Sequence, residues 1–351
     1  MAPVSGSLPP LRLAINGYGR IGRCFLRALH ERGLADRFQV VAINEPANSE
    51  SIAYLTRFDS THGRFPAPVE LQDGTLVIDG RSIQLTHADT PEGVDWRSLK
   101  VDLLVECSGQ YSNRAGLRRF LEAGCPRVLL SHPANSAADV DATVVYGLNH
   151  GRLNGDERIV SNASCTTNAV VPVLELLDRE LGLEQVLLTT LHSVMNDQPL
   201  VDGYHHSDLR RTRSAMQSMI PVSTGLARGV ERLLPGLKGK VLAKAIRVPT
   251  LNVSAIDLTV TLAQDADVAG LNALLQIASN GPWKGVLTTS AAPHASIDFN
   301  HDPHSAIVDL SQTRAGGARL FNLFIWFDNE WGFVNRMVDV AQRWHAGWSR
   351  S

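Results

Sequence analysis

Residues 11–22 read Leu-Arg-Leu-Ala-Ile-Asn-Gly-Tyr-Gly-Arg-Ile-Gly, an apolar run followed at once by the pattern Gly-x-Gly-x-x-Gly. The apolar run is typical of a short buried strand, and residues 23–32 have helical character and end at Gly33. A second apolar stretch, residues 38–44, predicts another strand, which Glu45 closes. A strand, a glycine-rich turn, a helix, a strand and an acid within about thirty residues are typical of a dinucleotide-binding fold.

Each glycine of this motif has a physical role. Gly17 permits the tight turn, Gly19 lets the backbone approach a pyrophosphate, and Gly22 lets the helix pack against the strand. The start of the helix then faces the phosphates, because its unpaired N–H groups favour negative charge. Glu45 would accept hydrogen bonds from the adenosine ribose and repel a 2′-phosphate, which predicts NAD rather than NADP. The same glycine pattern also occurs in ordinary loops, but here both of its flanks fit the fold.

Further strands alternate with a helix in the first half of the chain. We expect strands at residues 101–107, 127–131 and 142–146, and a helix at residues 115–123. This alternation predicts an α/β domain with a doubly wound parallel sheet, the Rossmann fold. Ser131 stands at the end of one of these strands, at the sheet edge where ligands bind in such folds.

The stretch Ser-Asn-Ala-Ser-Cys-Thr-Thr-Asn, residues 161–168, indicates a reactive thiol. Cys165 lies between small hydroxyl residues and shortly before an apolar run that predicts a helix from Ala169. The positive end of a helix dipole favours thiolate, the nucleophilic form of the side chain. His192 ends a strand-like run further on and could pair with that thiolate and act as acid and base. The alternative is an inert buried thiol, the usual state of a free cysteine.

After the cysteine the pattern of elements changes. Strands are expected at residues 186–192, 241–248, 254–262 and 320–327, with a helix at residues 267–279. This order predicts an α+β catalytic domain with a mainly antiparallel sheet.

A long polar segment, residues 193–214, follows His192 and contains three arginines within four residues, Arg210, Arg211 and Arg213. Guanidinium groups match phosphate oxygens, so we expect an anion site there. For one or two of the arginines the alternative is a solvated surface or a subunit contact.

These elements predict three parts. Residues 1–10 are rich in proline and glycine and are expected to be a disordered lead-in. Residues 11–164 would form an NAD-binding Rossmann domain, completed by a C-terminal helix over about residues 329–351. Residues 165–328 would form the catalytic domain.

Composition excludes several classes of protein. The 33 basic and 35 acidic residues give a formal net charge of −2, which predicts no nucleic-acid partner and no attraction to an anionic membrane. No apolar run approaches membrane-spanning length, and the first residues lack the features of a signal peptide. Four cysteines in 351 residues make no disulfide framework, which favours a reducing, cytoplasmic compartment. We expect no metal, because no cysteine or histidine pair has zinc spacing, and inert core thiols at Cys24, Cys107 and Cys125.

Four stretches of the sequence resemble the glyceraldehyde-3-phosphate dehydrogenase superfamily. They are residues 14–23, residues 161–168, Arg247-Val-Pro-Thr and Asp328-Asn-Glu-Trp-Gly, and they occur in family order. The resemblance covers nearly the whole chain, roughly residues 11–345. It implies an NAD cofactor, a phosphorylated aldose substrate and a homotetramer.

The resemblance also implies roles for individual residues. Cys165 would attack the aldehyde and His192 would take up the proton of the resulting hydroxyl. The implied cofactor contacts are Gly17, Gly19, Arg20, Ile21, Gly22, Glu45, Ser131 and Asn329. The implied substrate-binding residues are Ser164, Thr166, Arg211, Thr224 and Arg247.

Within the superfamily the chain is most similar to the branch that oxidises D-erythrose 4-phosphate. The segments at residues 131–133, 208–213 and 298–309 match that branch, and Met195 stands where the glyceraldehyde-phosphate branch has a phosphate-binding threonine. This resemblance implies that water hydrolyses the acyl-enzyme to 4-phosphoerythronate, in vitamin B6 biosynthesis. Two alternatives stay open: a phosphorylating glycolytic enzyme, in which inorganic phosphate takes the acyl group, and a binding protein without catalysis.

Overall fold

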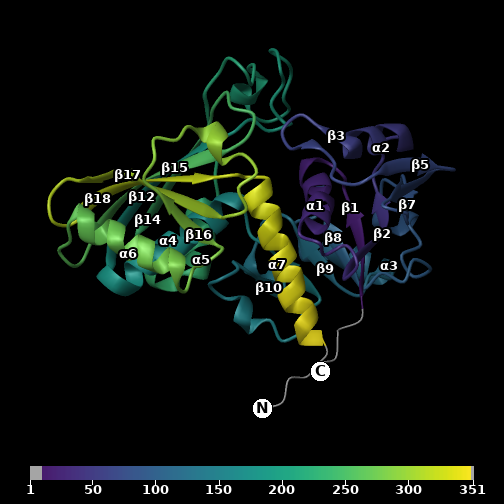
Figure 1. The fold of residues 1–351 in the computed structure, drawn as a ribbon, viewed down its shortest axis with the longest axis horizontal. Coiled ribbons are helices and arrows are strands. Elements are labelled where there is room, and N and C mark those ends of the chain that lie inside the picture. The colour runs from purple at the N-terminus through teal and green to yellow at the C-terminus, as the bar shows by residue number, and fades with distance from the viewer. Residues whose placement is uncertain (1–9, 349–351) are drawn as a thin grey trace. The chain divides into compact units, whose positions relative to one another are not determined.

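The computed structural model describes residues 10–348. Within these residues the chain divides into two units, the first formed by residues 10–163 with 334–348 and the second by residues 164–333 (Figure 1). Residues 1–9, which hold nearly all of the expected lead-in, lie outside the described residues, as do residues 349–351 at the end of the expected C-terminal helix.

A nine-stranded sheet forms the centre of the first unit, in the order β10-β11-β9-β8-β1-β2-β7-β6-β5. Neighbouring strands from β10 to β7 are parallel, and β7, β6 and β5 form antiparallel hairpins. The chain passes from β1 to β2 on one side and returns to β8 on the other, which confirms the predicted doubly wound sheet. The strands are β1 Leu11–Asn16, β2 Phe38–Asn44, β5 Val69–Gln72, β6 Thr75–Ile78, β7 Arg81–Thr86, β8 Leu103–Glu106, β9 Val128–Leu130, β10 Ala142–Thr143 and β11 Ile159–Ser161.

Local signals in the sequence set the helix boundaries of this unit. Helix α1 (Arg20–Glu31) begins directly after Gly19. Asparagine side chains accept hydrogen bonds from backbone N–H groups at the starts of α2 (Ser49–Arg57) and α3 (Arg114–Ala123), and both are therefore capped. Gly124 ends α3 with a left-handed φ of 118°, which glycine adopts without strain. The shorter elements are the strands β3 Phe58–Asp59 and β4 Gly63–Arg64 and the 3₁₀ turns η1 Pro91–Gly93, η2 Ala137–Asp139 and η3 His150–Arg152.

The core of the first unit lies along its parallel strands. Every residue of β8 and β9 is buried, as expected where helices cover both faces of a parallel sheet. Trp96 and Phe120 are fully buried in one apolar cluster with Leu104 and Val128. Helix α7 (Trp331–Trp348) ends the described chain, and most of it belongs to this unit. Arg32 joins that part of α7 to the end of α1 by an ion pair to Asp339 at 2.7 Å.

A seven-stranded mixed sheet forms the second unit, in the order β13-β14-β12-β15-β18-β17-β16. The pairs β12–β14 and β16–β17 are parallel and the other four are antiparallel, which confirms the predicted, mainly antiparallel sheet. The strands are β12 Leu183–His192, β13 Ile220–Val222, β14 Val241–Arg247, β15 Ser254–Leu262, β16 Leu287–Ser290, β17 Ala306–Ala315 and β18 Leu320–Phe327.

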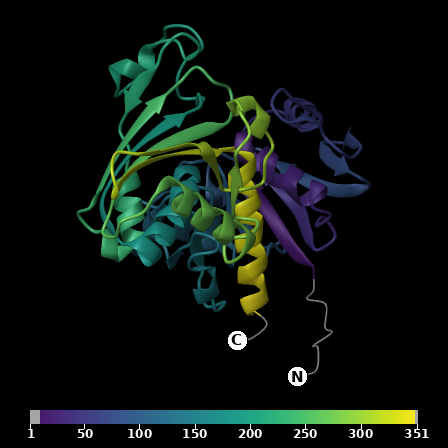
Figure 2. The same ribbon diagram turned by 60° about the vertical axis from the view of Figure 1, so that its left-hand side comes forward.

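Helices lie against one face of this sheet (Figure 1 and Figure 2). Helix α4 (Cys165–Leu181) contacts β12, β15, β17 and β18, and α6 (Val268–Asn280) contacts β16 and β17. Helix α5 (Leu226–Leu233) packs against α4 and β14. The remaining turns are η4 Leu209–Thr212, η5 Pro235–Leu237 and η6 Ser296–Phe299.

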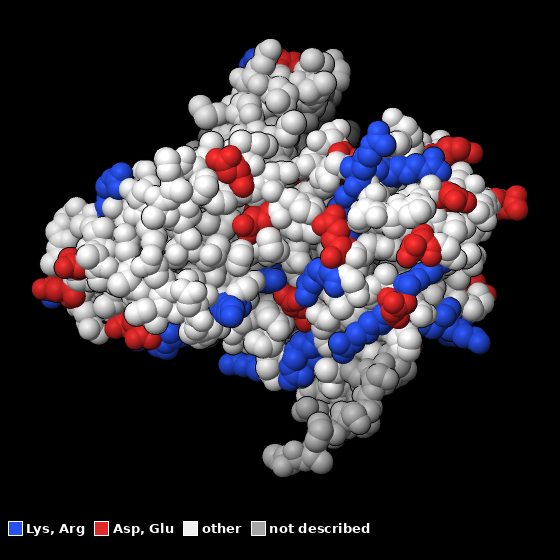
Figure 3. Space-filling model, viewed as in Figure 1, with Lys and Arg blue, Asp and Glu red and all other residues white. Residues whose placement is uncertain are grey.

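The composition gave expectations about the surface charge and about the hydrophobicity of the helices. Basic and acidic side chains are interspersed on both units over the face that Figure 3 shows. None of the helices within residues 10–348 is long and apolar enough to span a membrane.

Candidate active site

Cys165 is the first residue of α4, four residues before the predicted start of that helix. The preceding Ser164 caps the helix, because its Oγ accepts a hydrogen bond from Thr167 N at 3.0 Å. Between β11 and this cap, Ala163 has a left-handed φ of 56°. Such a conformation costs an alanine about 1–3 kcal/mol, so the surrounding packing must hold the turn that directs Cys165.

A histidine stands next to this thiol. Cys165 Sγ lies 3.6 Å from His192 Nε2. On the other side of the ring, His192 Nδ1 lies 2.8 Å from the carbonyl oxygen of Ser193. Because a carbonyl oxygen only accepts, Nδ1 carries the proton and Nε2 is left to accept from the thiol. The ring is therefore held in the tautomer that a base at Cys165 requires.

The electrostatics of the pair favour its charged form. Burial alone would raise the pKa of the Cys165 thiol, but the hydrogen bond and charge of His192, with a smaller contribution from Thr166, hold that pKa below its usual value. Burial would lower the pKa of His192, but its bond to Cys165 raises it above its usual value. At two other thiols burial prevails: with the charge of Glu106 it raises the pKa of Cys107 against a hydrogen bond to Ser131, and it raises that of Cys125 to about 12.

Strand register brings an arginine to the same place. His192 and Arg247 are paired residues at the ends of the parallel strands β12 and β14. Ile220 of β13 pairs with Arg247 on its other side, so the strands flank this arginine and only 5% of its surface is exposed. Arg247 Nη2 also lies 3.5 Å from the sulfur of Met195.

The carboxylate of Asp197 is paired with both of the arginines that sequence analysis assigned to anion binding. Arg247 donates from both terminal nitrogens to Asp197, at 2.6 Å and 3.1 Å. Arg211 donates to the same carboxylate at 2.8 Å. The structure therefore brings Arg211 and Arg247 together, with Asp197 between them.

Three further predicted residues lie in the second unit. Thr166 Oγ1 is 3.9 Å from Cys165 Sγ. Thr224 follows β13, and its hydroxyl accepts from the backbone N–H of Leu226, the first residue of α5, at 3.2 Å. Asn329 follows β18, and its amide oxygen accepts the hydroxyl groups of Ser193 at 3.0 Å and Ser254 at 2.8 Å. These two bonds fix the orientation of the Asn329 amide and leave its N–H groups as the donors for a ligand.

In the first unit, a cavity of about 270 Å³ opens at the carboxyl ends of β1, β2 and β8. Gly17 and Gly19 line it, and the turn admits no side chain at the first of them. A Cβ on Gly17 would lie 2.4 Å from the backbone nitrogen of Ser108, and one on Gly22 would lie 2.4 Å from the Gly17 oxygen. A Cβ on Gly19 would meet no atom within 4 Å, so this position is open to a ligand. Each glycine thus fits its predicted role beside a pyrophosphate.

Glu45 also lines this cavity. Its carboxylate accepts from Tyr18 N in the glycine-rich turn at 2.7 Å. The other predicted cofactor residues of this unit are not in the lining: Gly22 and Ile21 lie on α1, Ser131 follows β9, and the Arg20 guanidinium pairs with Asp59.

Family models match both units. Residues 11–114 match the glyceraldehyde 3-phosphate dehydrogenase NAD binding domain, and residues 164–329 match the glyceraldehyde 3-phosphate dehydrogenase C-terminal domain. Together these matches cover well over half of the chain.

The chain belongs to the glyceraldehyde-3-phosphate dehydrogenase family. It is thus an NAD-dependent dehydrogenase of phosphorylated aldehydes. The cavity at the glycine-rich turn fits this cofactor, because Gly19 leaves room for a pyrophosphate and the Glu45 carboxylate, an acceptor of the kind that ribose hydroxyls need, lines the same cavity.

Sequence analysis missed a buried polar network beneath the cofactor cavity of this dehydrogenase. Asn16 at the end of β1 donates to Glu106 at the end of β8 at 2.6 Å, and Asn44 at the end of β2 donates to Asn16 at 2.8 Å. Glu106 also accepts from Ser108 N at 2.8 Å, and burial raises its pKa. The signal was present, since asparagine ends two predicted strands, but the pairing depends on the strand order.

Asp197 is the other residue of the site that sequence analysis did not predict. It was one polar residue among many in the segment after His192, and no spacing in the sequence pairs it with Arg247.

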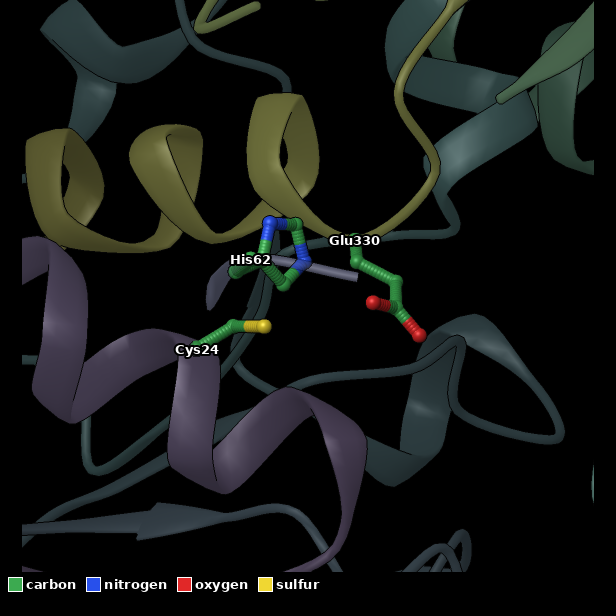
Figure 4. A group of neighbouring side chains, drawn as sticks. All are labelled: Cys24, His62 and Glu330. Carbon is green, nitrogen blue, oxygen red and sulfur yellow. The ribbon is translucent and has the colours of Figure 1, made fainter. Parts of the chain in front are cut away.

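One cluster raises the question of a metal. Among residues 10–348, Cys24 of α1 and His62 bring a thiol and an imidazole nitrogen within 4.8 Å of each other. Figure 4 shows these side chains with Glu330, which precedes α7 and belongs to the second unit. A structural zinc takes four ligands, so the two that the first unit supplies here do not make a site. The absence of a metal in this protein remains a prediction.

Proposed function

We propose that this dehydrogenase oxidises D-erythrose 4-phosphate to 4-phosphoerythronate through a thioester on Cys165 that water hydrolyses. The observation that carries the choice of substrate is Met195, whose sulfur lies beside Arg247 where the glyceraldehyde-phosphate branch has a hydroxyl. Met195 donates no hydrogen bond, so the substrate phosphate depends on the arginines and is free to sit differently. The four-carbon chain itself is inferred from the segments that resemble the erythrose-phosphate branch.

Cys165 and His192 would carry the covalent steps. The Cys165 thiolate attacks the aldehyde carbon and forms a carbon–sulfur bond, and the backbone N–H of Cys165 stabilises the developing oxyanion. His192 Nε2, which faces the sulfur, gives its proton to the resulting alkoxide and takes it back from the hydroxyl of the thiohemiacetal as the carbon is oxidised. NAD supplies the hydride acceptor when bound.

Hydrolysis would use the same histidine. After it has released its proton to solvent, His192 accepts a proton from water as the water attacks the thioester carbon. The carbon–sulfur bond then breaks, which releases the acid and restores the Cys165 thiolate.

The remaining residues would bind the two ligands. Arg247 and Arg211 have the planar donor geometry that phosphate oxygens match, and Ser164, Thr166 and Thr224 offer hydroxyls near the starts of α4 and α5. For the cofactor, Glu45 favours NAD over NADP through charge repulsion. Asn329 would donate its amide N–H groups, and Arg20, Ile21, Gly22 and Ser131 complete the proposed contacts.

The alternative is the phosphorylating glycolytic reaction. The hydroxyls of Ser164 and Thr224 favour it, because they could bind the inorganic phosphate that takes the acyl group in that reaction. The two functions share nucleophile, base and cofactor, and they differ in substrate and in acyl acceptor.

Steady-state NADH formation distinguishes the two functions. We expect a higher kcat/KM with erythrose 4-phosphate than with glyceraldehyde 3-phosphate in phosphate-free buffer, and no requirement for added phosphate. Cys165→Ala serves as the blank and should form no NADH with either aldehyde. A preference for glyceraldehyde 3-phosphate, with turnover that needs inorganic phosphate, would make the chain the glycolytic enzyme.

A further inference from the structure

The carboxylate of Asp197 accepts hydrogen bonds from the two guanidinium groups that the proposed function assigns to the substrate phosphate. It accepts two hydrogen bonds from Arg247 and one from Arg211, all between 2.6 Å and 3.1 Å. Two planar guanidinium groups that converge on one set of oxygens form the arrangement that binds a phosphate. Asp197 therefore stands where such an anion would bind.

Asp197 is ionised in this arrangement. Burial works to raise its pKa, but Arg247 and Arg211 together hold the pKa below its usual value. Arg211 also pairs with Asp208, at 3.5 Å, so two carboxylates offset the two guanidinium charges, and a phosphate that approaches meets little net positive charge while Asp197 stays in place. Met195, at 3.5 Å from Arg247, adds no charge.

The backbone around Asp197 is anchored on both sides of the residue. Val194 N donates to Thr250 O at 2.9 Å, and Gln198 N closes a turn onto Met195 O at 3.0 Å. Ala215 N donates to Pro199 O at 2.9 Å. These bonds hold the backbone of the segment, so the movement that would release the arginines is a rotation of the Asp197 side chain.

Asp197 and Arg247 differ in the fraction of the side chain that is exposed to solvent. The Asp197 side chain is 40% exposed, whereas that of Arg247 is only 6% exposed. A displaced Asp197 carboxylate can turn into water at little cost. Arg247 has no such freedom, so it needs an anion beside it at all times.

We propose that Asp197 is a built-in competitor of the substrate phosphate, which holds the Arg211–Arg247 pair in the free enzyme and is displaced when a phosphorylated ligand binds. This inference rests on the proposed function in one respect, the assignment of these arginines to the phosphate. A phosphate dianion outcompetes the monoanionic carboxylate, whereas weaker anions do not. Asp197 thereby selects phosphorylated aldehydes over carboxylates and sugars that lack the phosphate.

The test is the affinity for inorganic phosphate in the Asp197→Asn variant, measured by titration calorimetry. Asparagine keeps the shape and the acceptor oxygen and removes the competing charge. We expect phosphate to bind about two- to fivefold more tightly, the range for loss of a partly exposed ion pair. The KM for the phosphorylated aldehyde should fall in parallel.

Asp202→Asn is the matched control, because Asp202 pairs with Arg213 at 3.0 Å in the same segment and both side chains are well exposed. This variant should bind phosphate as the wild type does. Asp197→Ser provides a second variant without the charge, and it should shift the phosphate affinity in the same direction as Asp197→Asn.

The possible results separate this inference from the proposed function. Unchanged or weaker phosphate binding in both Asp197 variants would overturn it, because Asp197 would then act only to position the arginines. Tighter phosphate binding without oxidation of erythrose 4-phosphate would support the inference and reject the substrate. Oxidation of erythrose 4-phosphate with phosphate affinity unaffected by Asp197 would reject the inference alone.

Discussion

At the scale of single residues, the reactivity of Cys165 depends on the orientation of one ring. His192 donates from Nδ1 to a backbone carbonyl and faces the thiol with Nε2. The lowered pKa of Cys165 and the raised pKa of His192 both favour the pair of thiolate and imidazolium. The thiolate is lost as the pH falls through the Cys165 pKa, and the imidazolium is lost as the pH rises through the His192 pKa.

We therefore expect iodoacetamide to alkylate Cys165 at neutral pH, where a free thiol is only about a few per cent thiolate. Replacing His192 by Asn should move the alkylation profile to higher pH, since burial then acts on the thiol without its partner. Mass spectrometry of the labelled peptides across a pH series measures this shift. Cys107 and Cys125, whose pKa values burial raises, are the internal controls. An unchanged profile in His192→Asn would show that another group activates the thiol.

At the scale of secondary structure, the start of α4 depends on one cap. Ser164→Ala removes the acceptor for Thr167 N, and loss of such a cap typically costs about 1 kcal/mol. When the intact protein is unfolded in urea, the second unit should therefore unfold with a lower midpoint concentration of urea. Ser279→Ala is the matched control, because Ser279 lies at the exposed end of α6 and its hydroxyl bonds only within its own turn. A midpoint that falls equally in both variants would assign no special role to the cap.

Sequence patterns located the long apolar elements well. The predicted bounds of β1, β2, β15 and β18 are those of the structure, because their apolar runs are bounded by polar residues or turns. Other strands were not predicted. They are β16 and β17 in the second unit and the hairpin of β5 and β6 in the first unit. Strands of mixed polarity gain their stability from neighbours that are distant in sequence, which a local pattern does not contain.

Several predicted boundaries differ from those of the structure, and two of the differences have local reasons. Helix α4 begins at Cys165 and not at Ala169, because the Ser164 cap compensates for the weak helix propensity of the threonines that follow. Strand β10 ends at Thr143 and not at residue 146, because the Asn149 side chain takes the backbone N–H of Val145. In the site, Cys165 and His192 were found from their local settings. Asp197 was not, because its pairing requires the β12–β14 register and the turn after β12.

At the scale of the whole molecule, the second unit leaves apolar surface uncovered. The segment after β12 extends beyond the sheet of its own unit in both ribbon views (Figure 1 and Figure 2). Its exposed large side chains include Leu200, Tyr204, Leu209 and Met219. The sheet face that points away from α4 carries two more, Leu187 and Leu242. Uncovered apolar side chains that cluster in this way mark interaction surfaces, and the family resemblance implies that further copies of the chain cover them in a homotetramer.

We expect the 38.2 kDa chain to sediment as a tetramer at micromolar concentration. Replacing Tyr204 and Leu209 together by Ser should shift this equilibrium towards smaller species, because both side chains are largely exposed within one chain and removing them weakens only the contact between copies. Ile277→Ser is the control, since Ile277 is 70% exposed on α6, away from that segment. Analytical ultracentrifugation over a concentration series measures all three proteins. A wild-type monomer at every concentration would contradict the assembly, and a tetramer that survives the double replacement would place its contacts on other surfaces.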